Sequence, residues 1–459
     1  MNPDGSALNR GAIRALSRLT FSLAIPLAMQ NLIAFAVNMM DTLMLGQLGK
    51  IPLSASAQAN QLFFIVTLAV GGVVGGANVL TAQAWGKRDV ATIHRVLAYA
   101  YRTALAIALL ATLAAVVFPV PVMRLFSPDD AVVRAGADYL RIVGFSYLFY
   151  TLTTVTTGAL QAVHTVHIAM LGSAAAMLIN IVLNWALIFG RMGFPALGIS
   201  GAAIATLIAR LCEFTIVLFY VYGKEDKLRL RVKKLLAVDK TLARRFFAIS
   251  LPVIANELFW ALGEAALAVL MGRMGTEMVA ANSICSVAGQ FASIFCRGVT
   301  AAACVIVANT VGAEKNDELA IQTRYFQRLS LLLGIVAGAI ILLVRPLMLR
   351  MYNVDTLTLH YASQIMLIEA GIQVFRYYQL MNMMGILRGG GDVHFAMAND
   401  LIFLWGFTVP AGFLAGLVLH WPVAVVYAII KFDQIIKVVS SALRLRNDKW
   451  VHNTVQKED

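Results

Sequence analysis

Acidic and amide side chains are spaced at helical intervals in an apolar segment near the start of this chain. Asn31, Asn38 and Asp41 are spaced seven and three residues apart, so they share one face of a helix. A carboxylate in an apolar setting can take up and release a proton near neutrality, or hold a sodium ion together with an amide and backbone carbonyls. Asp41 and Asn38 are therefore predicted ion-coupling residues, and Gln30 and Asn31 predicted substrate ligands. A structural carboxylate held by neighbouring helices is the alternative.

A second polar face follows 226 residues later. At that offset, Asn31 and Asn38 become Glu257 and Glu264, with Trp260 between the two acids. An ionisable group in mid-bilayer costs roughly 2.5–3.5 kcal/mol on insertion scales, so each one needs a reason. Carboxylates beside an indole suit a cationic amphipathic ligand, which gains charge neutralisation and a cation–π contact. The two glutamates are predicted to couple ions, and Asn256 and Trp260 to bind substrate.

The two faces belong to an internal repeat. The offset of 226 aligns five widely spaced residues of the first half, Phe21, Pro26, Gly46, Gly49 and Gly86, with identical residues of the second half. One residue more aligns 166–170 with 393–397. A membrane chain of two copies has a seam between them, and transporters place their substrate site at such a seam. Pro26 and Pro252 each remove a helical hydrogen bond, which predicts a hinge in each copy, with a static kink as the alternative.

The composition is that of a polytopic membrane protein. Hydrophobic residues make up 60% of the chain and charged residues 13%, and the mean hydropathy is +0.77, whereas soluble chains carry about a quarter charged residues. We expect an all-α membrane protein of two pseudo-symmetric lobes, 1–225 and 226–459, with six spans each. The expected spans lie near 20–46, 57–84, 97–120, 134–158, 166–190, 199–222, 246–271, 279–309, 326–348, 358–386, 394–418 and 422–441.

The net charge of +13 reflects membrane topology and not nucleic-acid binding. Basic residues flank spans 1, 2 and 12 and fill a linker at 223–245, and all these segments share one side of a twelve-span chain. The positive-inside rule makes that side, and both termini, cytoplasmic. The linker is expected to be a basic helix on the cytoplasmic surface, with membrane lipids as partners.

Charged residues in the last span of each copy form a further pattern. At an offset of 221, Arg210 aligns with Lys431. Arg210 with Glu213, and Lys431 with Asp433, are possible internal ion pairs that make burial tolerable. Snorkelling of the basic residues to the interface is an equal alternative. Asp400, in the expected span 394–418, is a further predicted substrate ligand.

The motifs of common enzymes are missing from the sequence. Neither HExxH nor GxSxG occurs, and no pair of the four cysteines has metal-site spacing. The glycines of 71–76 resemble a phosphate loop but lack the GK[ST] ending, so close helix packing is favoured. We therefore predict no enzyme, no metal and no cofactor. Without a Walker A motif, uphill transport requires an ion gradient.

Several strings resemble the multidrug and toxin extrusion (MATE) family of cation-coupled antiporters, part of a wider superfamily of drug exporters and oligosaccharide flippases. They cover nearly the whole chain: Pro26 with Asp41-Thr-Leu-Met-Leu-Gly-Gln-Leu-Gly49, Thr81-Ala-Gln-Ala-Trp-Gly86, residues 193–206 and Leu387-Arg-Gly-Gly-Gly-Asp392. The Asn256-Glu257-x-x-Trp260 pattern looks like a distinct bacterial branch of that family.

The resemblance implies a V-shaped central cavity between two lobes that opens alternately to each side. It implies export of organic cations in exchange for protons or sodium. Asp41 matches the family's helix-1 carboxylate, and Asn180 matches an asparagine that supports it. Asn184 stands where some members carry an aspartate, and Asp392 matches an aspartate before helix 11, a substrate ligand by this likeness.

The sequence thus predicts a monomeric secondary antiporter in the inner or plasma membrane, exporting organic cationic or amphipathic compounds by alternating access. One alternative is a flippase for lipid-linked oligosaccharides or cell-wall precursors. Such proteins tend to have extra spans and an arginine-rich cavity, whereas the stripes found here are acidic. A membrane scaffold without transport is the other alternative, and the internal repeat weighs against it.

Overall fold

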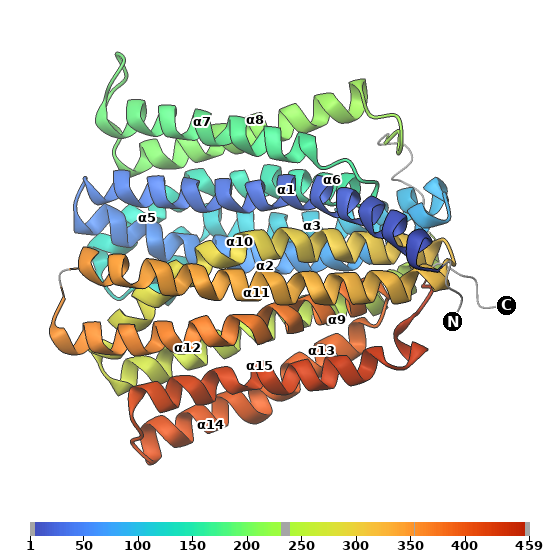
Figure 1. Cartoon of the computed structure of the whole chain (residues 1–459). Helices are drawn as coiled ribbons and strands as arrows, with labels where there is room; N and C mark the ends of the chain where they lie inside the picture. Colours follow the sequence, from blue (N-terminus) through green and yellow to red (C-terminus); the bar gives the residue numbers. More distant parts are fainter. Residues whose placement is uncertain (1–4, 231–238, 353, 455–459) are drawn as a thin grey trace. The chain divides into compact units, whose positions relative to one another are not determined.

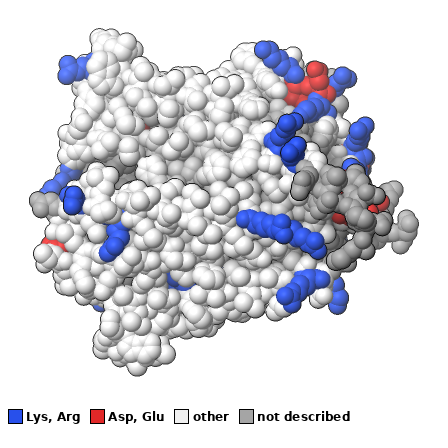
Figure 2. Space-filling view, in the orientation of Figure 1, with Lys and Arg blue, Asp and Glu red and all other residues white. Residues whose placement is uncertain are grey.

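The computed structural model describes residues 5–230, 239–352 and 354–454, and this part of the chain is helical apart from turns and one isolated bridge. Nine of the described helices are long and apolar enough to cross a membrane. In Figure 2 the charged side chains lie mostly towards the ends of the helices, and the surface between is white. The protein is therefore an all-α membrane protein, as predicted.

The first copy of the repeat begins with two long helices that meet at a tight turn. Gly49 adopts φ 113° there, and Gly275 adopts φ 132° at the equivalent turn of the second copy. Only glycine accepts such angles without strain, which explains why both positions repeat. The helices of this copy are α1 (Gly5–Gly46), α2 (Lys50–Gly86), α3 (Val90–Val117), α4 (Pro119–Phe126), α5 (Asp130–Val143), α6 (Ser146–Ala162), α7 (His167–Phe189) and α8 (Ile199–Gly223).

The second copy ends in helices that contain π-helical turns. Its elements are α9 (Lys240–Met274), α10 (Thr276–Gly312), α11 (Asn316–Met351), α12 (Thr356–Leu380), η2 (Met381–Leu387), α13 (Val393–Phe403), η3 (Leu404–Thr408), α14 (Val409–Phe413), η4 (Leu414–Val418), α15 (Val423–Leu445) and η5 (Asp448–Trp450). Three expected spans fall on α5–α6, α12–η2 and α15, which are outside the nine. The first is split into two short helices, and the other two carry buried charged residues.

Contacts group the chain into two compact units. The amino-terminal unit is Met29–Ile254, and the carboxy-terminal unit is Met1–Ala28 with Ala255–Asp459. The chain changes unit two residues after Pro26 and again two residues after Pro252, at equivalent positions of the repeat. The predicted lobes, 1–225 and 226–459, follow the repeat, whereas the compact units exchange the beginnings of α1 and α9.

Small residues allow each exchanged helix start to pack closely within its unit. In the amino-terminal unit, a Cβ added to Gly72 would lie 2.6 Å from the Ile254 Cα, and one added to Gly76 would lie 2.6 Å from the Ser250 Cα. In the carboxy-terminal unit, a Cβ on Gly298 would lie 2.6 Å from the Ala24 carbonyl oxygen. Gly72 and Gly76 thus serve close packing of backbones, the use favoured from the sequence for this glycine-rich stretch.

Both described ends of the linker are docked on the amino-terminal unit. The His94 Nε2 lies 2.7 Å from the Leu228 carbonyl oxygen, and the Arg95 Nη1 lies 3.1 Å from the Asp239 Oδ2. Asp239 precedes α9, and its pKa is lowered mainly because its carboxylate accepts the backbone N–H of Leu242. The centre of the predicted linker helix, 231–238, lies outside the described residues.

Alanine substitutions at neighbouring glycines test this packing. Gly72→Ala should lower the melting temperature of the purified protein, because the new methyl group meets the backbone of Ile254 and overpacking costs about 1–3 kcal/mol. Gly71→Ala is the matched control, since its added Cβ has nothing within 4 Å and alanine is the better helix former. Equal melting temperatures for the two variants would contradict the close packing.

Candidate functional site

Asp41 begins a chain of polar side chains inside the amino-terminal unit. The Asn184 Nδ2 lies 2.5 Å from the Asp41 Oδ1 and donates to it, and the same nitrogen lies 3.0 Å from the Asn180 Oδ1. Asn180 in turn donates to the Thr206 hydroxyl at 3.4 Å. Asn180 and Asn184 are buried and one turn apart on α7, so they share one face of that helix. The structure therefore brings together three of the predicted ion-coupling residues.

An ion pair lies beside this chain on α8. The Arg210 Nη1 is 2.8 Å from the Glu213 Oε2, and the Ser173 hydroxyl donates to the other carboxylate oxygen at 2.6 Å. The guanidinium also lies 5.2 Å from the ring centre of Tyr150. Arg210 interacts electrostatically with Asp41 as well, so one cation serves two carboxylates. This arrangement places a permanent positive charge next to the predicted ion site.

The other predicted residues of α1 lie further from this chain. Asn31 and Asn38 are exposed on the surface of the molecule, and Gln30 is half-buried. The amide that donates to Asp41 is that of Asn184. The role predicted for Asn38, to hold a sodium ion together with Asp41, stays a prediction. The shared helix face of α1 is therefore only partly used by the polar chain around Asp41.

A second, mixed-charge group lies on one face of the carboxy-terminal unit. The Arg388 Nη1 is 3.8 Å from the Glu257 Oε1, and Arg297 on α10 also interacts electrostatically with Glu257. Glu264 is exposed two turns further along α9, and Trp260 between them is half-buried. The acidic stripe expected from the sequence is thus accompanied by arginines. The neighbouring Asn256 is buried, and its Oδ1 has no partner among the described residues.

A buried glutamate organises the interior of the same unit. Glu369 accepts hydrogen bonds from the Arg376 guanidinium at 3.0 Å, the Tyr427 hydroxyl at 2.9 Å and the Gln373 amide at 2.9 Å. Lys431 lies 5.4 Å from the ring centre of Tyr427. These contacts give the buried carboxylate both a counter-charge and full hydrogen bonding, as burial in a span requires.

The predicted ion pair of Lys431 with Asp433 is wrong. Asp433 pairs instead with Lys437, whose Nζ lies 2.8 Å from Asp433 and 2.7 Å from Asp400. The physical reason is helical geometry, because residues two apart point to different sides of a helix and residues four apart point to the same side. Lys437 is only 4% exposed, so one buried ammonium holds two carboxylates. Asp400, a predicted substrate ligand, therefore already shares a cation inside the unit.

Asp392 also has an internal partner. The Arg444 Nε lies 2.7 Å from its Oδ2, and residues of the C-terminal segment pack against the adjoining glycines. A Cβ on Gly390 would lie 2.4 Å from the ring of Trp450, and Gly391, at φ 92°, forms a bridge with Val451. The glycine-rich string before Asp392 is thus a docking place for the end of the chain, which favours a structural role for this aspartate.

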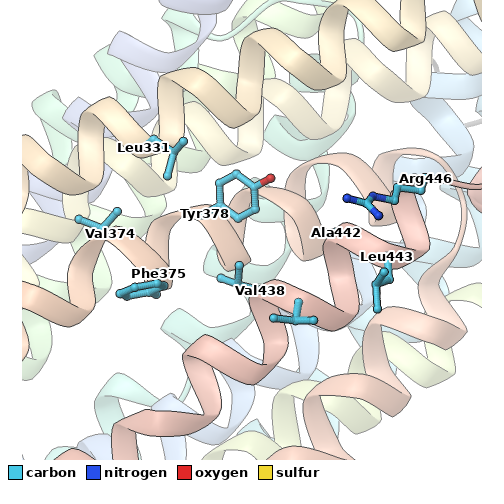
Figure 3. Close-up of a pocket in the computed structure, with 9 residues that line it drawn as sticks. Leu331, Val374, Phe375, Tyr378, Val438, Ala442, Leu443 and Arg446 are labelled. Atoms are coloured by element: carbon cyan, nitrogen blue, oxygen red, sulfur yellow. The ribbon is translucent and has the colours of Figure 1, made fainter.

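An open cavity of about 400 Å³ lies elsewhere in the carboxy-terminal unit. Figure 3 shows the side chains that line it. Side chains of α11, α12 and α15 line it, and almost all are apolar. Its charged group is Arg446, at one end. The lining contains none of the predicted ion-coupling or substrate residues, so this cavity is distinct from the polar groups described above.

Comparison with known proteins gives the family. The profile of the MatE family matches the chain twice, over residues 26–186 and 252–414, which together make up most of its length. The chain belongs to the MatE family. The two matches begin at Pro26 and Pro252, the prolines that precede the change of unit, so each copy of the repeat is one family module.

Relatives of this transporter carry names of drug resistance. A protein of Bacillus subtilis named "Probable multidrug resistance protein YoeA" is 23% identical over 398 residues, 85% of each chain. A protein of Halalkalibacterium halodurans named "Probable multidrug resistance protein NorM" is 24% identical over 403 residues, 86% of this chain and 87% of the relative. The likeness therefore extends over nearly the full length of both.

Solved structures share the fold of the transporter. A MATE protein in a bent conformation matches with a TM-score of 0.86 at 16% identity, covering 99% of this chain and 100% of that one. A transporter of the MOP superfamily from Pyrococcus furiosus, titled for the reverse polarity of its binding pocket, matches with a TM-score of 0.83 at 17% identity, covering 94% and 96%.

Four basic residues of the transporter's polar groups were missed in the sequence: Arg297, Arg376, Arg388 and Lys437. Arg297, Arg376 and Lys437 lie within expected spans, where any charge is costly, so their positions alone were a usable signal. The repeat does not point to Arg297, because this residue aligns with Gly71 at the offset of 226. A search for unmatched charges between the copies would have found that arginine.

Removal of the buried lysine tests the charge balance of the carboxy-terminal unit. Lys437→Met should lower the free energy of unfolding by about 3–5 kcal/mol, because it leaves two buried carboxylates without a cation. Asp400→Asn added to that variant should recover part of the loss. Lys315→Met is the control, since the exposed Lys315–Glu318 pair contributes about 0–1 kcal/mol. Similar melting of both lysine variants would contradict this interpretation.

Proposed function

We propose that the transporter is a cation-coupled antiporter that exports organic cationic or amphipathic compounds by alternating access, with protons or sodium as the coupling ion. The observation that carries this proposal is the polar chain of Asp41, Asn184 and Asn180 inside a membrane-spanning unit. A carboxylate held by amides within a span is expensive to keep and exchanges a cation readily, so it marks an ion pathway.

In this proposal, the carboxylates of Asp41 and Glu213 compete for the guanidinium of Arg210. When Asp41 is ionised and empty, it attracts the guanidinium that otherwise pairs with Glu213. A proton or sodium ion on Asp41 removes that attraction and returns Arg210 to Glu213. The two pairings give the coupling ion a differential free energy between conformations, about 1.4 kcal/mol for each tenfold change in equilibrium.

The route of α1 offers a way to transmit this change. Asp41 lies in the amino-terminal unit, and the same helix continues through Pro26 into the carboxy-terminal unit. Fifteen residues separate Asp41 from Pro26, about 22 Å along a helix. Proline removes one backbone hydrogen bond at that point, so we propose that Pro26, and Pro252 on α9, are hinges between the units.

The substrate face in this proposal is the mixed-charge group of the carboxy-terminal unit. Glu257 and Glu264 attract a cation, and the Trp260 indole offers apolar and cation–π contact. Gln30, Asn31 and Asn256 remain predicted substrate ligands of the proposal. Asp392 and Asp400 have internal counter-ions, so their predicted substrate role finds no support in their contacts.

We further propose that the transporter works as a monomer in the inner or plasma membrane with both termini cytoplasmic. The support is the asymmetry of basic residues along the sequence, with the linker 223–245 and the terminal segments 1–18 and 442–459 carrying sixteen of the 37. Membrane lipids are the expected neighbours of its apolar surface, and Arg446 at the end of the apolar cavity suits an anionic headgroup.

Transport in everted vesicles tests the coupling site. Ethidium efflux should be driven by an imposed proton or sodium gradient in the wild type, and Asp41→Asn should abolish that dependence because no charge remains to exchange. Glu257→Gln should slow ethidium transport several-fold by weakening the attraction for the cation. Both rates are read from the fluorescence of the dye under each gradient separately.

Asp138→Asn is the matched control for these variants. Asp138 is an exposed aspartate paired with Arg141, and its loss should leave transport unchanged. Wild-type rates in both Asp41→Asn and Glu257→Gln would overturn the assignment of the sites. Absence of any gradient-driven transport of organic cations in the wild type would favour the flippase or scaffold alternatives.

A further inference from the structure

The apolar cavity of the carboxy-terminal unit is formed by three helices. Phe375 and Tyr378 are among the lining residues of α12, which packs against both α11 and α15 (Figure 3). Leu331 contributes from α11, and the rest of the lining comes from α15 and from Arg446 directly after it. The volume of about 400 Å³ falls within the usual range of ligand sites, about 300–1,000 Å³.

The surface around this cavity is apolar and exposed. Val439 and Leu443, which line it on α15, are 56% and 54% exposed, and Leu332, next to the lining residue Leu331 on α11, is 57% exposed. Helix α11 is long and apolar enough to span the membrane. Exposed apolar surface on such helices is where a membrane protein meets lipid, so an acyl chain reaches the cavity from the bilayer without crossing water.

The polar groups of the cavity gather at one end. Arg446 is exposed there, and its guanidinium has no ion pair or hydrogen bond among the described residues. In Figure 3 the hydroxyl group of Tyr378 is turned towards the same end. A guanidinium and a phenol offer hydrogen-bond donors to a phosphate, whereas every other lining side chain is a hydrocarbon. The cavity therefore fits a ligand with an anionic head and an apolar tail.

This end of the cavity lies on the side predicted to be cytoplasmic. The amide of Asn453, shortly after α15, donates to Glu314 at 3.3 Å in the turn before α11, so the end of α15 and the start of α11 share one side of the unit. Arg324 and Arg328 lie between that start and Leu331, on the helix face of Leu331. Both are exposed, and neither has an acidic partner in the described part of the chain.

We propose that the apolar cavity binds an anionic phospholipid of the cytoplasmic leaflet, with its phosphate on Arg446 and an acyl chain along α12 and α15. Charge complementarity selects this occupant, because a zwitterionic lipid brings its own cation towards the arginines and a free phosphate leaves the apolar lining uncovered. The site is separate from the residues proposed to bind ion and substrate. A lipid that bridges α12 and α15 also stabilises the folded unit.

A pair of lipids that differ only in the headgroup tests this inference. Dioleoyl phosphatidylglycerol is anionic and dioleoyl phosphatidylcholine is zwitterionic, and native mass spectrometry of the detergent-purified protein gives the affinity for each. The wild type should bind one phosphatidylglycerol about tenfold more tightly than phosphatidylcholine. Arg446→Gln should weaken phosphatidylglycerol binding about tenfold and leave phosphatidylcholine binding unchanged, because a charge-assisted hydrogen bond is lost. Retained phosphatidylcholine binding shows that the variant is folded.

Three further variants separate the headgroup, the cavity and the net charge. Arg446→Lys should retain part of the preference, because it keeps the charge without the planar fork. Ala442→Trp fills the cavity and should remove the preference although Arg446 is still present. Arg14→Gln removes an exposed arginine of α1 with the same change in net charge as Arg446→Gln, and should leave both affinities unchanged.

Photolabelling of the wild type in nanodiscs locates the lipid without any substitution. Phosphatidylglycerol with a diazirine in its acyl chain should label the peptides that contain Phe375 and Val439, which line the cavity. Unlabelled phosphatidylglycerol should compete with this labelling, and glycerol phosphate, the soluble headgroup, should not. Competition by glycerol phosphate would overturn the lipid as occupant in favour of a free anion.

Other outcomes overturn the inference as well. Equal affinity of the wild type for the two lipids, or equal losses in Arg446→Gln and Arg14→Gln, would mean that Arg446 recognises no headgroup. An intact preference in Ala442→Trp would indicate a charged surface patch and not a site in the cavity. None of these results bears on export, which is measured by ethidium transport in vesicles, so the two proposals fail separately.

Discussion

Charges inside membrane-spanning helices must be compensated within the protein, and this constraint governs the interior of the transporter. The buried ones are met by direct partners: Asp41 by the amide of Asn184, Glu369 by Arg376 and Tyr427, and Lys437 by two carboxylates. Each arrangement replaces lost hydration with hydrogen bonds and opposite charge.

The two copies of the repeat use this constraint differently. The amino-terminal unit has one carboxylate held by a neutral amide, with the Arg210–Glu213 ion pair nearby, a setting suited to exchange of a small cation. The corresponding face of the second copy replaces Asn31 and Asn38 with glutamates and Gly71 with Arg297. The repeat provides two similar helical bundles. In the proposal, the first copy binds the coupling ion and the second binds the substrate because of these few replacements. Helix α1 is continuous and contributes residues to both units, so in the proposal it connects ion binding with substrate binding.

The sequence was sufficient for the fold class and the family, because the apolar repeat and the motif strings extend over nearly the whole chain. The grouping of Asp41 with Asn180 and Asn184 followed from the resemblance to the family, which names these positions. The sequence did not predict that the first turns of α1 and α9 belong to the opposite units, because this depends on tertiary contacts such as the packing of Gly72 on Ile254. The pairing of Lys431 with Asp433 failed because proximity in sequence was taken for proximity on a helix face. Arg297 was visible as a mid-span charge but has no equivalent in the first copy, so a search guided by the repeat passed over it.

Coupling between the occupancy of Asp41 and the affinity for substrate is the central claim, and equilibrium affinity measures it most directly. Substrate affinity of the purified transporter should be determined across a range of pH and, separately, of sodium concentration. The account predicts that affinity in the wild type falls as the coupling ion fills Asp41 and levels off at a total loss of about 5–150-fold, and that Asp41→Asn shows no such dependence. The same ion dependence in Asp41→Asn as in the wild type would contradict it.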